Sequence, residues 1–154
     1  MVFQGFGSDL RLLHDLTHQD DRHRGSDLST ARRPQTGLID LAVVSSVDNL
    51  EQALLLRFLT HTGELAVLGH PDYGCLLFTL IGELNNDSNR DLAKLYTLEA
   101  LQAEPRVKEV ASVDVTQDPN YPDTVNIQVS IIPIDSSTPL DLVFGFSFTG
   151  GINL

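Results

Sequence analysis

The chain has 154 residues, of which 42% are apolar, and a formal net charge of −11. This length and composition are typical of one globular domain with a real core, and they argue against a disordered chain. Cys75 is the single cysteine, which excludes an internal disulfide and is compatible with a reducing compartment. No apolar stretch approaches the roughly 18 residues of a transmembrane helix, and the N-terminus lacks the features of a secretory signal.

Charge is distributed unevenly along the chain. Residues 1–35 carry five arginines and five aspartates and are neutral overall. Residues 36–154 carry 5 basic and 16 acidic residues, and 5 − 16 gives −11. A strongly acidic body repels nucleic acid and anionic lipid and favours basic protein partners. We therefore expect protein partners, no nucleic acid and no membrane insertion.

Two units are predicted, an N-terminal extension over residues 1–37 and a domain over residues 38–154. Between about residues 17 and 37 the charges are mixed and apolar residues are few, which is typical of an extended arm that orders only on a neighbour. Ahead of that stretch, Ser8 could cap a short helix. Its apolar residues would be Leu10, Leu13 and Leu16.

Three histidines in the same region raise the question of a metal site. His14 and His18 are four residues apart, the spacing of two ligands on one helix face, and His23 follows. A metal site needs further ligands in fixed geometry. The preferred interpretation is a solvated polar arm with incidental histidines, so we expect no metal.

Three helices are predicted between residues 38 and 103, after a short strand or extended segment at 38–44. The first, near residues 48–61, has an apolar stripe at Leu50, Leu54 and Phe58. The second is a buried helix of at most three turns within residues 75–84. The third runs over about residues 89–103, behind an imperfect capping box that starts at Ser88.

Three side chains in this region have alternative interpretations. Arg57 lies beside the apolar stripe of the first helix, so it either extends to solvent or pairs with an acid such as Glu64. Cys75 lies in an apolar run and is predicted to be a small buried residue, not a reactive thiol. His70 lies in a turn cluster and is predicted to face water.

The C-terminal third predicts three consecutive strands. The first begins at Val107, with an irregular alternation near Lys108-Glu109 that indicates a bulge. The second alternates strictly over residues 125–131 and ends at Pro133. The third spans about residues 139–149. The predicted fold class is therefore α+β: about three helices packed on a C-terminal three-stranded antiparallel sheet, with an extended N-terminal arm. One sheet edge could receive a strand from another chain.

The tripeptide Glu104-Pro105-Arg106 sits between the last predicted helix and the first strand. Proline excludes its predecessor from the helical region, so Glu104 should end the helix. Two opposite charges on a stiff corner indicate docking, because a general acid needs a second group that converges on a cleft.

Catalysis has little support in the sequence. The chain has no Gly-rich phosphate loop, no Gly-x-Ser-x-Gly elbow and no Cys/His cluster in its acidic body. A glycosidase pair, Glu64 with Asp72 or Glu83 with Asp87, stays open, although any acidic chain offers such pairs. We expect no enzyme and no cofactor.

Two runs of residues carry a resemblance to a protein family. Residues 54–65 followed by His70-Pro71-Asp72-Tyr73-Gly74, and residues 98–107 followed by three strands, resemble the baseplate wedge or sheath-initiator proteins of contractile tails. That family includes the wedge protein of T-even phages, protein W of temperate phages and the type VI secretion subunit TssE. The resemblance covers about residues 38–149. Some members carry a historical lysozyme label, which does not imply an activity here.

The resemblance implies a structural subunit, present in six copies per baseplate, that joins the inner ring to the first sheath disc by strand exchange. Its localisation would be the bacterial cytoplasm during assembly and then the tail or injection particle. Glu104 and Arg106, held apart by Pro105, would contact the wedge core bundle or the sheath. The strands at about 123–133 and 139–149 would form the sheath-facing platform. The interface residues predicted on these strands are Val125, Ile127, Leu142 and Phe144.

Two points stay open beside that expectation. The N-terminal arm has no counterpart in the common core and could fasten to a neighbouring baseplate, tube or hub protein. The alternative function is an adaptor or inhibitor that binds another partner through its sheet edge, or a lysozyme-like hydrolase. The sequence does not distinguish a phage tail, a secretion system and a released injection particle.

Overall fold

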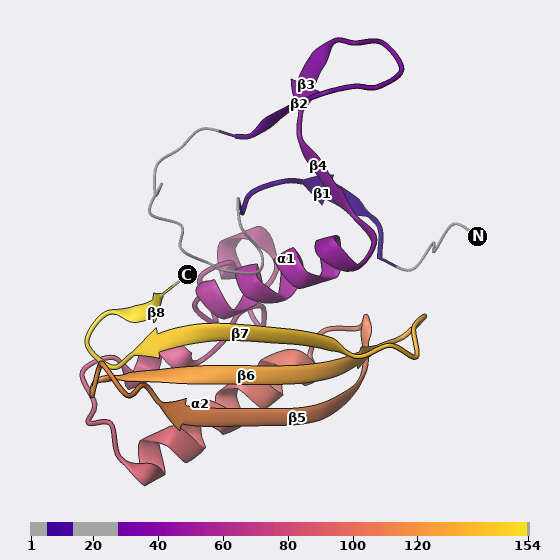
Figure 1. The fold of residues 1–154 in the computed structure, drawn as a ribbon. Coiled ribbons are helices and arrows are strands. Elements are labelled where there is room, and N and C mark those ends of the chain that lie inside the picture. Colours follow the sequence, from indigo (N-terminus) through magenta and orange to yellow (C-terminus); the bar gives the residue numbers. More distant parts are fainter. Residues whose placement is uncertain (1–5, 14–27, 154) are drawn as a thin grey trace.

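The structure is a computed structural model that describes residues 6–13 and 28–153 (Figure 1). Leu16 and the three histidines of the possible metal site, His14, His18 and His23, lie outside the described residues. Within the described part, no helix is both long and apolar enough to cross a bilayer.

Two α-helices and eight short or long strands make up the described chain. In order they are β1 (Ser8–Leu10), β2 (Thr30–Arg32), β3 (Ile39–Leu41), β4 (Val43–Ser45), α1 (Ser46–Leu59), the 3₁₀ turns η1 (Ala66–Leu68) and η2 (Leu77–Leu80), α2 (Asp87–Gln102), β5 (Val107–Gln117), β6 (Thr124–Pro133), β7 (Leu140–Ser147) and β8 (Gly151–Asn153). The main sheet is antiparallel with the order β5-β6-β7-β8, and two small sheets pair β1 with β4 and β2 with β3. The prediction of three helices on a three-stranded sheet is therefore wrong for both layers: the described chain has two α-helices, and the main sheet has four strands.

The missing helix is the apolar run at residues 75–84. Its backbone is tied to the segment after α1, because Cys75 donates its N–H to the Thr60 carbonyl at 2.9 Å. Gly82, with a φ of 95°, ends the run after the single 3₁₀ turn η2. Leu77 and Leu80 are still buried. A short apolar run indicates that its residues are buried, but it does not determine which secondary structure they adopt. The prediction of an α-helix over residues 75–84 was wrong for this reason.

The additional strand, β8, follows β7 after a tight turn. Gly151 has a φ of 85°, and the chain reverses so that residues 151–153 pair with residues 145–147. Gly150-Gly151 directly follows the last predicted strand, and glycine pairs favour turns. A strand of only three residues has too little alternation to be recognised in a sequence.

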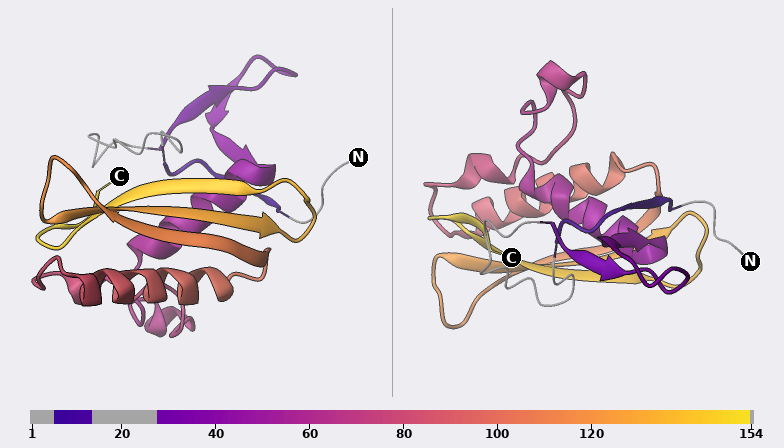
Figure 2. Two further views of the ribbon diagram at one scale, coloured as in Figure 1. Left: turned by 60° about the horizontal axis from the view of Figure 1, so that its bottom comes forward. Right: turned by 90° about the horizontal axis from the view of Figure 1, so that it is seen from above.

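The three long strands follow the predicted pattern. The register of β5 on β6 shifts between Val107 and Glu109, which confirms the predicted bulge, and β6 ends at Pro133. Their inward side chains form the core with both helices, which lie on one side of the sheet (Figure 2). Phe58 of α1 stacks on Phe144 of β7 with ring centres 4.7 Å apart. The opposite face of the sheet carries Asn126, Gln128 and Ser130 of β6 beside Asp141 and Val143 of β7.

The N-terminal prediction is corrected where the chain is described. Ser8–Leu10 is a strand paired with β4, not the start of a helix. Residues 28–37 are not an extended arm, because β2 and β3 form a hairpin that projects from the body (Figure 1). β1 and β4 are distant in sequence, and β2 and β3 are separated by a loop. Neither pairing has a strong local signature in the sequence.

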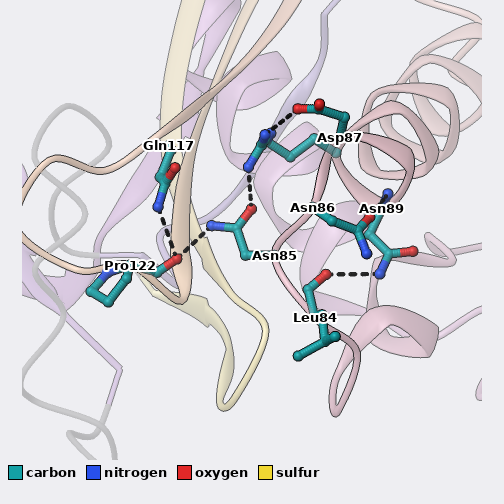
Figure 3. A network of polar contacts seen from close by, with 8 residues as sticks. Leu84, Asn85, Asn86, Asp87, Asn89, Gln117 and Pro122 are labelled. Carbon is teal, nitrogen blue, oxygen red and sulfur yellow. Dashed lines mark hydrogen bonds and ion pairs between the residues drawn. The ribbon is translucent and has the colours of Figure 1, made fainter.

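The start of α2 is fixed by polar contacts (Figure 3). Asn86, not Ser88, is the N-cap, and its side-chain oxygen accepts from the Asn89 N–H at 2.9 Å. Asn85 donates to the Pro122 carbonyl at 2.6 Å and accepts from Arg90 at 2.8 Å. These bonds join the beginning of α2 to the loop between β5 and β6.

Candidate functional site

The tripeptide Glu104-Pro105-Arg106 forms the corner between α2 and β5, where the sequence predicts it. The helix ends as Glu104 donates its N–H to the Leu101 carbonyl at 3.1 Å, and the strand begins as Val107 donates to the Glu104 carbonyl at 3.0 Å. The corner therefore turns within three residues, and Pro105 at its apex is exposed.

The Glu104 side chain points into the protein and is only 5% exposed. One carboxylate oxygen, Oε1, accepts from Arg106 Nε at 2.6 Å, and the other, Oε2, accepts from Arg57 at 3.2 Å. Arg57 is 6% exposed, and its guanidinium carbon lies 4.4 Å from the centre of the Tyr73 ring. The pairing of Arg57 with Glu64 is wrong, because Glu64 instead accepts from the His61 backbone.

This ion cluster, defined as Arg57, Glu104 and Arg106, shifts the acidity of its carboxyl. Burial raises the pKa of Glu104, but the hydrogen bonds and charges of Arg106 and Arg57 outweigh burial and hold the pKa below its ordinary value. The carboxylate is thus ionised inside the protein. Within the described residues, Arg57 Nε is buried without a hydrogen-bond partner, so Glu104 is the main compensation for a buried cation.

The cluster also reaches the N-terminal segment. Arg106 donates to the Phe6 carbonyl at 3.5 Å, and Asn49 of α1 donates to the same oxygen at 2.6 Å. Phe6 is 2% exposed and belongs to the core. The ion cluster therefore connects the corner between α2 and β5 to α1 and to Phe6 of the same chain.

Gln52 holds the rest of this segment on α1. Its carbonyl oxygen accepts from the N–H groups of Leu12 and Leu13 at 2.8 and 3.2 Å, and its amide donates to the Leu10 carbonyl at 2.9 Å. Sequence reasoning missed both Gln52 and Asn49. The available signal was that Asn49, Gln52 and the apolar Leu55 follow one another at three-residue spacing and so share one side of α1, and buried amides need partners.

The predicted interface residues on the strands are buried, whereas residues that dock on a partner are normally exposed. Val125, Ile127, Leu142 and Phe144 are at most 2% exposed and face the helices. Their side chains form the core, so any contact that these strands make with a partner runs through backbone edges or outward side chains. Their assignment to an interface stays a prediction.

Backbone groups at one edge of the sheet are available for such a contact. β6 is internal, whereas β7 is paired with β8 only at residues 145–147. The register begins with Thr124 opposite Ser147, and one residue beyond that pair the Phe148 N–H donates to the Asp123 carbonyl at 2.8 Å. Because backbone groups alternate sides along a strand, those of Asp141 and Val143 point away from β6. Within the described residues no strand pairs with β7 there.

Other titratable groups give no converging arrangement in the described part. No cluster of three or more His, Cys, Asp or Glu residues suited to a metal is found among residues 6–13 and 28–153. Cys75 is buried as predicted, and burial raises the pKa of its thiol to about 11. His70 is exposed in its loop, as predicted. Of the carboxylates proposed as glycosidase pairs, Asp87 is paired with Arg90.

Comparisons with known proteins point to one fold. No protein-family model matches the sequence, and no curated protein matches it. Among solved structures, the chain is similar to a protein from Geobacter sulfurreducens described as a candidate tail lysozyme. The two chains share a fold. The TM-score is 0.59 at 24% sequence identity, over 68% of this chain and 93% of the other.

Proposed function

We propose that this protein is a structural subunit of a contractile phage tail or a related injection particle, in the baseplate, where it binds the first sheath disc by strand exchange. The observation that carries the proposal is the half of the β7 edge, at Asp141 and Val143 beside the short β8, that no strand of the described residues covers. An open edge of this kind is a template for a strand from another chain. The proposal treats the chain as a structural protein and not as a hydrolase.

Two further features support the proposal. The fold is shared with a protein whose description places it in a tail, and the sequence resembles baseplate wedge proteins at the corner formed by Glu104, Pro105 and Arg106. Besides any contact with a partner, the corner has a structural role in this chain. The bonds of Glu104 to Arg57 and Arg106 orient β5 relative to both helices. Contact of this corner with the wedge core bundle rests on the resemblance alone.

The first experiment is negative-stain imaging of particles from cells that lack the gene. Missing tails or tails without sheath are the expected result, because an initiator is needed before sheath can polymerise. Normal contractile particles would overturn the proposal. Copurification gives an independent outcome: baseplate and sheath proteins agree with the proposal, whereas one unrelated binder would identify an adaptor or inhibitor instead.

A second experiment addresses the edge itself. Val143→Pro removes an outward N–H, and proline is tolerated on a strand edge that faces away from the ladder. Val143 is 51% exposed, so little packing is lost. The matched control, Val143→Thr, keeps the N–H. We expect both variants to fold, and only Val143→Pro to give unsheathed tails. Normal sheath assembly by a folded Val143→Pro protein would exclude this edge as the site of strand addition.

A further inference from the structure

The hairpin of β2 and β3 buries few of its own side chains and therefore has few stabilising contacts. All three β2 residues are exposed, and β3 exposes Ile39 and Leu41 by 68% and 42%. A two-stranded hairpin without a covered apolar face is marginally stable in water. It nevertheless projects well away from the sheet (Figure 1), where residues of this apolar character are unusual unless something covers them.

One face of the hairpin is an apolar stripe with a cation at its end. Ile39 and Leu41 of β3 share this face, and Val43, the first residue of β4, continues the alternation just beyond the hairpin and is 56% exposed. Arg32 lies directly opposite Ile39 in the register, so it is on the same face. Arg33 is paired with Asp40 on the other face, whereas within the described residues the Arg32 guanidinium contacts the Gly37 carbonyl, at 2.8 Å, and no carboxylate.

The exposed face of α2 has the complementary composition. Leu92 and Leu95 are 37% and 45% exposed. Asp91 and Glu99, both exposed, lie four residues before and after Leu95 and therefore on the same side of the helix. The opposite face of α2, with Ala93 and its neighbours, packs on the sheet. The outer face is thus an apolar pair with a carboxylate at each end.

We propose that the β2–β3 hairpin of one copy docks on this outer face of α2 in a second copy of the chain. The apolar stripe would cover Leu92 and Leu95, and Arg32 would meet one of the two flanking carboxylates. Charge favours this occupant: residues 28–43 hold two Arg and one Asp, for +1, while residues 44–154 hold 5 basic and 15 acidic residues, for −10.

The arrangement of the two surfaces makes the contact intermolecular. The hairpin and α2 lie at opposite ends of the molecule in Figure 1 and in the left view of Figure 2, so one copy cannot bring its own hairpin onto its own α2. A contact between two different surfaces is head-to-tail, and it closes into a ring or continues as an open chain according to the rotation between copies. This inference concerns self-association of the purified protein and does not depend on the proposed function.

The test is sedimentation velocity on the full chain over a concentration series. We expect reversible self-association that grows with concentration and weakens at high salt. Val43→Ser, which removes apolar contact from an exposed position, should raise the dissociation constant by roughly tenfold if Val43 is a central contact. A monomer at every concentration would overturn the proposal, as would association that is unchanged by Val43→Ser.

Charge reversal identifies the partner surface. Arg32→Glu alone, and Asp91→Lys with Glu99→Lys, should each reduce self-association, and an equimolar mixture of these two variants should recover it. Asp135→Lys changes an exposed loop charge away from both surfaces and is the matched control. Circular dichroism of each variant checks that it is folded. Loss of association in both variants without recovery in the mixture would refute the pairing of these two faces.

Discussion

Replacement of Glu104 by glutamine tests the ion cluster most directly. The substitution keeps the shape of the side chain but removes the charge that both arginines share. Arg57, at 6% exposure, cannot recover its lost interaction from water, whereas the Arg106 side chain is 26% exposed and can do so in part. Removal of one partner from a buried ion pair costs about 3–5 kcal/mol. Because Arg106 is partly hydrated, we expect the lower end of that range.

A loss of about 3 kcal/mol is easily measured. For a chain of this length it lowers the melting temperature by roughly 6–12 °C, and it lowers the urea midpoint with an unchanged slope. The matched control is Asp87→Asn, which breaks an ion pair whose aspartate side chain is 95% exposed. That substitution should cost less than about 1 kcal/mol.

A double substitution separates a lost charge from lost packing. With Arg57→Met added to Glu104→Gln, the buried cation is gone, and much of the lost stability should return. The reasoning is refuted if Glu104→Gln costs no more than Asp87→Asn, or if the double variant is as unstable as the sum of the two single ones.

The remaining predictions concern acid stability, the N-terminal segment and the thiol. Because Glu104 has a lowered pKa in the folded protein, its contribution is complete above the ordinary carboxyl value of 4.5 and is lost as pH falls through the lower folded value; Glu104→Gln should flatten this acid-side dependence in urea midpoints measured from neutral to low pH. Gln52→Leu should release residues 10–13 and increase amide exchange there, since three hydrogen bonds are lost; unchanged protection would contradict the assigned contacts. Cys75, with a thiol pKa of about 11, should react with a thiol reagent at pH 8 only after unfolding, and rapid labelling of the native protein would show that the site is open.

The structure also revises one expectation for Arg106. If Arg106 were only a docking charge on the surface, as the sequence predicts, its reversal would leave the domain folded. Its Nε lies 2.6 Å from a buried carboxylate oxygen, so Arg106→Glu would place a second carboxylate against Glu104 and should destabilise the fold. An assembly defect in that variant would therefore not identify a docking residue unless the purified protein were shown to be folded.

The sequence by itself determined the elements whose structure depends on residues close together in the chain. The stripe at Leu50, Leu54 and Phe58 predicted α1, and the alternation over residues 125–131 predicted the buried face of β6. Pro105 and Pro133 marked ends of elements because the proline ring restricts φ whatever the surroundings. These features follow from local geometry, which a sequence expresses directly.

Tertiary structure alone decided the features that join distant segments. The apolar run at residues 75–84 became a 3₁₀ turn because Cys75 bonds to Thr60, and β8 formed because β7 offered it an edge. The Glu104 carboxylate, predicted from the sequence to dock on a partner chain, is buried because α1 brings Arg57 to it from 47 residues away. Burial and pairing depend on which elements meet, and one sequence does not contain that information in any local pattern.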